Sequence, residues 1–203
     1  MKKKIENKAY RENKTGYILV QILTLIRIPL AVLFAVFLLS GKDSVAKLAI
    51  TLSLLVLIET TDAVDGKIAR FFKLVSEYGA TLDPFADSIS RLIVYWALAS
   101  HQLILFLVPL SMAVRDITVA YSRILLAQRG KSVSARISGK IKAITQASAS
   151  PLILLSPYYL DHTGTWPYYA LSWLVITVTL LSAIQYVRDA IVSIKRHHEK
   201  EQY

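Results

Sequence analysis

Residues 62–87 read DAVDGKIARFFKLVSEYGATLDPFAD and hold four aspartates in two pairs. Side chains three or four positions apart lie on one face of a helix. Asp62 therefore shares a face with Asp65, and Asp83 shares one with Asp87. A short turn between the pairs would make the two helices antiparallel, so we expect the four carboxylates to face one another at the same end.

Apolar segments extend on both sides of this stretch and determine the fold class. A helix needs about 20 mostly apolar residues to cross a membrane, and 54% of the 203 residues are hydrophobic. Six segments have that length or more, at residues 17–40, 44–72, 79–100, 103–127, 137–160 and 166–194. We therefore predict an all-α integral membrane protein with six transmembrane helices. Pro29 is expected to kink the first of them.

Positively charged residues predict the orientation of these helices. The chain has 24 Lys and Arg against 14 Asp and Glu, a net charge of +10. The basic residues gather in the N-terminal arm, the second and fourth connections and the tail, whereas the third and fifth connections have none. Since Lys and Arg mark the cytoplasmic side, both termini are predicted to be cytoplasmic. The predicted parts are a basic juxtamembrane segment (residues 1–16), one six-helix domain (17–196) and a tail (197–203).

The charge pattern and the composition exclude several other classes of protein. Basic clusters that alternate with long apolar runs indicate a lipid bilayer as the partner, and no nucleic acid. The lack of cysteine excludes disulfide scaffolds, cysteine-based zinc sites, iron–sulfur clusters and thiol nucleophiles. The four histidines lie in predicted connections or in the tail, so no Ser/His/Asp arrangement competes with the aspartates.

Four carboxylates at the edge of a bilayer predict a divalent metal site. In a low dielectric they would repel one another strongly unless a cation neutralised them. Oxygen ligands without His or Cys favour Mg²⁺ or Mn²⁺ over zinc, and four carboxylates that meet a diphosphate can hold two ions. The planar guanidinium of Arg70 would then bind phosphate oxygens beside the metal. Gly66, Ala69 and Gly79 lack side-chain bulk, which lets a helix or a ligand approach the backbone closely.

This stretch resembles the signature of the CDP-alcohol phosphotransferases, D-x2-D-G-x2-A-R-x8-G-x3-D-x3-D. Every position is met, by Asp62, Asp65, Gly66, Ala69, Arg70, Gly79, Asp83 and Asp87. The resemblance includes the six helices and the cytoplasmic arm, and so covers essentially the whole chain. It implies transfer of a phosphatidyl or related group from a CDP-linked lipid such as CDP-diacylglycerol to a hydroxyl acceptor, with release of CMP. It also implies a homodimer in a bacterial cytoplasmic membrane, with the active site facing the cytoplasm.

The resemblance also implies a role for each residue of the signature. Asp62, Asp65 and Asp83 would be metal ligands. Asp87 would be the general base beside the acceptor hydroxyl and would also touch metal. The CDP group would be bound by Asp62, Asp65, Gly66, Ala69, Arg70, Gly79 and Asp83, with the three small residues lining the cytidine pocket.

Cations outside the signature are candidates for binding a phosphate on the acceptor. Arg115 lies within an apolar segment next to Asp116, and Lys140 and Lys142 lie at the start of the following segment. The two lysines are two positions apart and cannot share one helical face, so at most one is expected to point inward. As alternatives, the lysines would anchor the helix to lipid headgroups, and Arg115 would simply pair with Asp116.

Three segments resemble the phosphatidylglycerophosphate synthase branch of this family, which implies glycerol 3-phosphate as the acceptor. They are Leu82–Asp87, Arg115-Asp116 and Gly139–Ala143, and residues 23–27 (LTLIR) resemble the first helix of that branch. Asp116, Ala143 and Ser88 stand where the branch has Glu, Thr and Lys, and Gln21 replaces an expected Asn. Phosphatidylglycerol, which cardiolipin synthases use, and inositol phosphate are the alternative acceptors.

Two other classes of protein would also place charged residues in apolar helices. A cation or proton transporter would also carry carboxylates within its helices, but it would need access from both sides. The aspartates are predicted at the cytoplasmic helix ends, and no second set lies near the outer connections. A purely structural membrane protein would leave the four facing aspartates unexplained. Arg91, one turn after Asp87, would either tune that carboxylate or pair with an acidic neighbour, and we favour the pairing.

Overall fold

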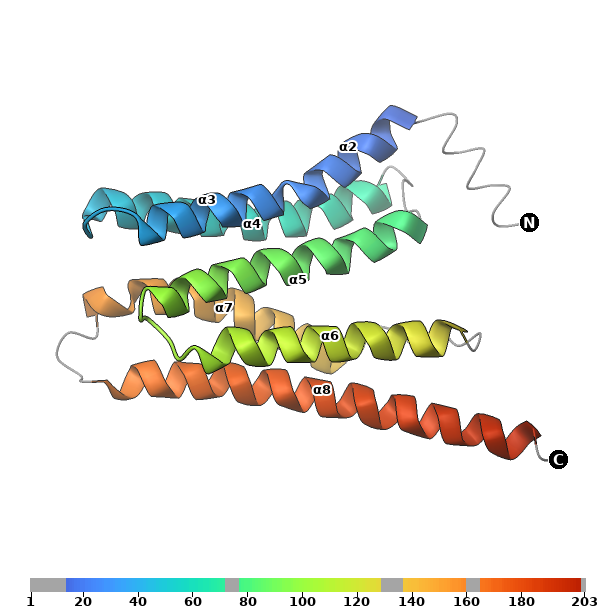
Figure 1. Ribbon diagram of the computed structural model, residues 1–203. Helices are drawn as coiled ribbons and strands as arrows, with labels where there is room; N and C mark the ends of the chain where they lie inside the picture. The colour runs from blue at the N-terminus through green and yellow to red at the C-terminus, as the bar shows by residue number, and fades with distance from the viewer. Residues whose placement is uncertain (1–13, 72–76, 129–136, 160–164, 202–203) are drawn as a thin grey trace. The chain divides into compact units, whose positions relative to one another are not determined.

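The structure is a computed structural model that describes residues 14–71, 77–128, 137–159 and 165–201. In these ranges the chain is helical apart from short connections and contains no strand (Figure 1). The helices are α2 (Lys14–Leu25), α3 (Arg27–Leu39), α4 (Val45–Phe71), α5 (Glu77–Ser100), α6 (Leu107–Gln128), α7 (Ile137–Tyr159) and α8 (Trp166–Glu201). The predicted all-α fold class is confirmed.

The first predicted helix is divided into α2 and α3 at Ile26 (Figure 1). Backbone hydrogen bonds still cross the division, from Ile26 N to Ile22 O (2.9 Å) and from Leu30 N to Ile26 O (3.1 Å). Pro29 has no N–H to donate to the carbonyl of Leu25, the last residue of α2. The single helix predicted for residues 17–40 is therefore two helices, and the proline accounts for the change.

The fourth predicted helix starts later than expected, because α5 ends in a turn of its own. Gln102 adopts a left-handed conformation with φ of 62°. Gln102 N donates to Ala99 O and Leu103 N donates to Leu98 O, each at 3.0 Å. Such a pair of bonds satisfies the last carbonyls of a helix that ends at a left-handed residue. The next helix, α6, then begins at Leu107 rather than at residue 103.

The chain divides into two compact units, Met1–Ala97 (unit 1) and Leu98–Tyr203 (unit 2). In unit 1, α2 and α3 lie along α4 (Figure 1). The buried apolar side chains of these helices recur at helical spacing and include Ala31, Phe34, Ala35, Leu38, Leu55 and Ile58. In unit 2, α8 packs against both α6 and α7. The buried side chains of unit 2 come from all three helices and include Val108, Met112, Val119, Ile153, Leu154 and Val175.

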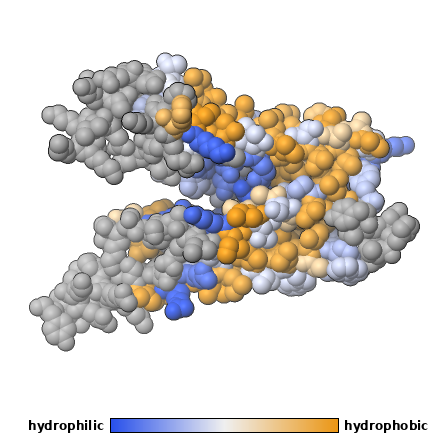
Figure 2. All heavy atoms as spheres, turned by 180° about the vertical axis from the view of Figure 1, so that it is seen from behind, coloured by the Kyte–Doolittle hydropathy of each residue, from blue (hydrophilic) through white to orange (hydrophobic). Residues whose placement is uncertain are grey.

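Large apolar side chains also cover much of the outer surface (Figure 2). By length and composition, Thr15–Leu39 and Trp166–Arg188 could each cross a membrane, and they are the two segments of the described residues that meet this criterion. The helices α4 and α5 carry the acidic residues of the predicted site, which lower their hydropathy. The six-span count and the cytoplasmic termini stay predictions.

The two ends of the chain are described to different extents. Most of the predicted juxtamembrane segment, residues 1–13, lies outside the described residues. At the other end α8 continues to Glu201, so the predicted tail at residues 197–203 is helical over most of its length. The single domain predicted for residues 17–196 stays a prediction beside the two units.

Candidate active site

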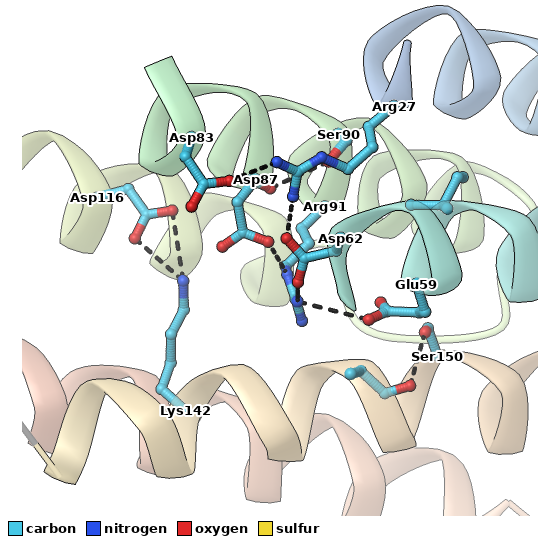
Figure 3. A network of polar contacts seen from close by, with 12 residues as sticks. Arg27, Glu59, Asp62, Asp83, Asp87, Ser90, Arg91, Asp116, Lys142 and Ser150 are labelled. Carbon is cyan, nitrogen blue, oxygen red and sulfur yellow. Dashed lines mark hydrogen bonds and ion pairs between the residues drawn. The ribbon is translucent and has the colours of Figure 1, made fainter. Parts of the chain in front are cut away.

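Three of the predicted aspartates come together in unit 1 (Figure 3). Asp62 lies in the second half of α4, and Asp83 and Asp87 lie one turn apart on α5. Figure 3 shows their carboxylates pointing toward the guanidinium groups of Arg27 and Arg91. The predicted convergence of α4 and α5 aspartates on one place therefore holds for these three residues.

Arg27 of α3 bridges the aspartates of the two neighbouring helices. Its Nη1 donates to Asp62 Oδ1, and its Nη2 donates to Asp83 Oδ1 at 2.6 Å. Its Nε donates to the carbonyl oxygen of Thr24 at 3.1 Å. That carbonyl lies in the last turn of α2, where carbonyl groups need partners other than the helix itself. The division between α2 and α3 thus provides an anchor for an arginine that is only 1% exposed.

Arg91 of α5 makes a second bridge on the same carboxylates. Its Nε donates to Asp87 Oδ1 at 2.6 Å, one turn earlier on the same helix. Its Nη2 lies 3.5 Å from Glu59 Oε2 and 3.7 Å from Asp62 Oδ2, both on α4. The sequence left two roles open for Arg91, which were to tune Asp87 or to pair with an acidic neighbour. Its contacts fit both roles, since it touches Asp87 and also Glu59.

We call these residues the carboxylate cluster. Its members are Glu59, Asp62, Asp83 and Asp87 with Arg27 and Arg91. Four carboxylates and two guanidinium groups give the cluster a formal charge of −2. A divalent cation would neutralise this charge, and the all-oxygen donor set fits Mg²⁺ or Mn²⁺. Within the described residues no three carboxylate or histidine side chains are placed to share one ion.

The remaining signature residues are only partly described. Asp65, Ala69 and Arg70 lie on α4, but their side chains fall outside what the structure describes. Gly66 on α4 and Gly79 on α5 are half-buried. Asp62 and Asp65 are three residues apart on a continuous helix, which is the spacing on which their predicted pairing depends. The metal-ligand and CDP-binding roles of these residues stay predictions.

A second polar cluster lies within unit 2, around the predicted acceptor residues. Arg115 Nη1 on α6 donates to Asp116 Oδ1 at 2.7 Å. Lys142 Nζ on α7 lies 3.2 Å from the same oxygen (Figure 3). Arg115 Nη2 also donates to Ser182 Oγ on α8 at 3.0 Å. Lys142 is buried and Lys140 is exposed. The expectation that at most one of the two lysines points inward is confirmed.

Tyr186 of α8 extends this cluster toward a third cation. The guanidinium carbons of Arg115 and Arg123 each lie 5.5 Å from the centre of its ring. At that distance a cation is attracted by the ring face. Arg123 Nη2 also donates to the Tyr186 hydroxyl at 3.3 Å. We call Arg115, Arg123, Lys142 and Asp116, with Tyr186, the cation cluster, and its formal charge is +2.

Two buried donors of this region have no partner in the part of the chain that the structure describes. They are Arg115 Nε and Ser138 Oγ. Ser138 belongs to the first turn of α7, and the neighbouring Gly139 lies close to Arg115 and Tyr186. The first turn of a helix carries a partial positive charge. The cation cluster therefore has charge and hydrogen-bond donors available for an anion.

Sequence reasoning missed Arg27, Glu59, Arg123 and Tyr186 as members of the two clusters, and Ser182 as a hydrogen-bond partner of Arg115. Arg27 had a detectable signal, because it is the one charged residue in the apolar stretch 17–40. Charged groups within such a stretch are costly unless they have a partner or a function. Glu59 had a signal too, since it lies three residues before Asp62 and shares its helical face. The other three depend on packing between α6 and α8, which no local pattern indicates.

The family model described as CDP-alcohol phosphatidyltransferase matches residues 17–185 of this chain. The match includes all of the signature, the whole carboxylate cluster and every member of the cation cluster except Tyr186, and the chain belongs to this family. Members of the family are membrane-associated enzymes that generally use divalent metal ions. The transporter interpretation receives no support from this result.

Several relatives carry one and the same name, CDP-diacylglycerol–glycerol-3-phosphate 3-phosphatidyltransferase. The protein of Bacillus subtilis is 32% identical over 183 residues, which cover 81% of this chain and 90% of that protein. The protein of Yersinia enterocolitica is 31% identical over 134 residues, or 64% of this chain and 72% of that protein. The Escherichia coli protein is 30% identical over 135 residues, with the same two shares.

Proposed function

We propose that this chain transfers a phosphatidyl group from CDP-diacylglycerol to glycerol 3-phosphate, forming phosphatidylglycerophosphate and CMP. The observation that carries the proposal is the convergence of Asp62, Asp83 and Asp87 in a cluster with an excess of negative charge. Family membership supports the type of reaction. The name shared by the relatives supports the acceptor.

On the donor side, the carboxylates would hold the metal and, through it, the diphosphate of the CDP-lipid. Asp62, Asp65, Asp83 and Asp87 are the proposed ligands of two Mg²⁺ or Mn²⁺ ions. When bound, the metal would neutralise the diphosphate and stabilise the charge that develops on CMP. Gly66, Ala69, Arg70 and Gly79 would bind the rest of the cytidine nucleotide.

The proton of the acceptor hydroxyl would pass to Asp87. As this proton leaves, the acceptor oxygen bonds to the phosphorus of the phosphatidyl group. The bond from that phosphorus to CMP breaks at the same centre, and CMP departs with the electron pair. A carboxylate within reach of the attacking hydroxyl is the type of base that this step requires.

On the acceptor side, the cation cluster would bind the phosphate of glycerol 3-phosphate. Its formal charge of +2 supports this role. So do Arg115 Nε and Ser138 Oγ, two donors that have no partner among the described residues. Of the three predicted residues, the buried Arg115 and Lys142 carry the proposal. The exposed Lys140 fits its alternative role as an anchor for lipid headgroups.

The arrangement in the membrane is proposed to follow the charge pattern of the sequence. Six helices would cross the bilayer, with both termini and the active site on the cytoplasmic side, and two copies would form a homodimer. The gathering of Lys and Arg in alternate connections supports this orientation.

The direct test is an assay of the purified full-length protein in detergent with CDP-diacylglycerol and Mg²⁺ or Mn²⁺. Glycerol 3-phosphate, inositol phosphate, phosphatidylglycerol and serine are supplied separately, and CMP release and the lipid product are measured. Phosphatidylglycerophosphate is the expected product. Product from another acceptor would overturn the choice of acceptor and keep the mechanism. No turnover with any of them would overturn the proposed function.

Variants of the aspartates test the assigned roles in the same assay. Asp62→Asn, Asp65→Asn and Asp83→Asn are expected to abolish CMP release, because each loses a charged ligand. Asp87→Asn is expected to abolish turnover, because the base is lost, while nucleotide binding persists through the three proposed metal ligands that remain. Full activity in any of the first three variants would contradict the metal assignment.

A further inference from the structure

We propose that Arg91, held in place by Glu59, is a positioning residue that fixes the orientation of the Asp87 carboxylate. Neither residue belongs to the family signature, so the pair is an addition to the site outlined above. The inference rests on the proposed function, because it concerns Asp87 as the base of the transfer reaction.

The first step of the argument is how Arg91 holds Asp87. Its Nε donates to Asp87 Oδ1 at 2.6 Å, which is a short charge-assisted hydrogen bond. One carboxylate oxygen of Asp87 is thus held by the protein. A carboxylate held in this way cannot rotate freely about its side-chain bonds.

The second step is what holds Arg91. Its side chain is only 8% exposed, and its Nη2 lies 3.5 Å from Glu59 Oε2 on α4. A guanidinium group is planar and rigid, so fixing Nη2 also fixes the direction of Nε. Glu59 therefore acts on Asp87 through Arg91, and the contact also ties α5 to α4. Figure 3 shows Arg91 between the two carboxylates.

The third step is competition for the same nitrogen. Arg91 Nη2 lies 3.7 Å from Asp62 Oδ2, nearly as close as it lies to Glu59. Attraction between buried charges rises steeply as they approach. Without the charge of Glu59, the guanidinium would move toward Asp62, a proposed metal ligand. Glu59 thus keeps Arg91 directed at the base and leaves the charge of Asp62 for the metal.

The test compares Arg91→Lys, Glu59→Gln and the double variant with the wild type. Lysine keeps the positive charge but is a point charge, so it cannot contact Asp87 and Glu59 with a rigid fork. We expect each single variant to lower kcat about 10- to 100-fold, as small misplacements of a catalytic group do. At a saturating metal concentration, KM for CDP-diacylglycerol and for glycerol 3-phosphate should change little. If Glu59 acts through Arg91, the double variant should be no slower than Arg91→Lys alone.

Metal affinity supplies a readout that is independent of turnover. Glu59→Gln should weaken Mn²⁺ binding, measured by titration, because Arg91 then neutralises part of the charge of Asp62. Arg91→Lys should not weaken it. A matched control is Asp43→Asn, which removes the surface ion pair between Asp43 and Lys47 at the other end of α4. Exposed pairs contribute little, so this variant should retain the wild-type kcat.

The outcomes separate the inference from the proposed function. An inactive wild type would overturn the proposed function and the inference with it. An active wild type whose kcat is unchanged in Arg91→Lys and Glu59→Gln would overturn the inference alone. Additive losses in the double variant would also overturn it, since they indicate independent structural roles. If Arg91→Lys does not fold, Glu59→Gln decides by itself, because it loses a charge without a change in volume.

Discussion

The carboxylate cluster of unit 1 and the cation cluster of unit 2 are built from the same kinds of side chain in opposite proportions. In unit 1, Arg27 and Arg91 bridge four carboxylates, and the formal charge is −2. In unit 2, Asp116 bridges Arg115 and Lys142, and with Arg123 the formal charge is +2. In both clusters the less abundant charge holds the more abundant one in place.

The sign of the remaining charge determines what each cluster can bind. Both proposed substrates carry phosphate, which is negative. A phosphate can bind to the cation cluster directly, through charge-assisted hydrogen bonds. A diphosphate would be repelled by the carboxylate cluster unless a cation lay between them. Only the carboxylate cluster therefore needs a metal, and this difference can be tested.

Removal of divalent metal is expected to have the largest effect, and it should affect the carboxylate cluster but not the cation cluster. Chelation with EDTA should abolish turnover and the binding of CDP-diacylglycerol, because the carboxylates would then repel the diphosphate. Binding of glycerol 3-phosphate, measured by calorimetry, should persist, since the cation cluster binds phosphate without a metal. Restored turnover on addition of Mg²⁺ or Mn²⁺ is the control. Loss of glycerol 3-phosphate binding on chelation would contradict the division.

Arg27→Ala is expected to have the next largest effect, on stability. Removal of one partner from a buried ion pair costs about 3 to 5 kcal/mol, and we expect the lower end because Asp83 is half exposed. The thermal midpoint without metal should fall by several degrees.

Added Mg²⁺ should then stabilise Arg27→Ala more than it stabilises the wild type, since it replaces the lost positive charge between Asp62 and Asp83. Thermal unfolding in detergent, with and without metal, measures both effects. Arg27→Lys is the control that keeps the charge. An unchanged midpoint in Arg27→Ala would show that the bridge contributes nothing to unit 1.

Arg115→Ala tests the cation cluster and should act on the acceptor alone. A hydrogen bond to a charged group contributes about 1.5 to 3 kcal/mol, so KM for glycerol 3-phosphate should rise about 10- to 100-fold. KM for CDP-diacylglycerol should stay the same, because Arg115 is not part of the donor site. Lys140→Ala is the matched control, since Lys140 is a basic residue of the same region with an exposed side chain. An equal rise for both variants would contradict the assignment.

The two clusters also differ in how much of them the sequence predicts. In unit 1 the aspartates lie at spacings of three and four on apolar helices, so their pairing follows from helix geometry. Arg27 lies 35 residues from Asp62 and 56 from Asp83, and its bridge depends on how α3 packs against its neighbours.

In unit 2 almost every contact joins residues that lie far apart in the sequence. Arg115 meets Ser182, and Arg123 meets Tyr186, across 67 and 63 residues. Helix lengths and local pairs follow from periodicity in one stretch of chain, whereas contacts between distant helices depend on side-chain packing that no single stretch contains. Lys140 and Lys142 show how far one stretch of sequence can predict the site. Their spacing predicts that at most one of them points inward, but not which one.

The smallest expected effect comes from two turn residues with a positive φ, one in each unit. Gly41 ends α3 with φ of 66°, and Gln102 follows α5 with φ of 62°. A side chain in this conformation costs about 1 kcal/mol, so Gln102→Gly should stabilise the protein slightly. Gly41→Ala should destabilise it by a similar amount, and by strain alone, because no atom of the described residues lies within 4 Å of the added methyl group. Neither residue belongs to a cluster, so kcat and both KM values should stay at wild-type levels. A lower thermal midpoint in Gln102→Gly would mean that the glutamine side chain makes a stabilising contact that outweighs the strain.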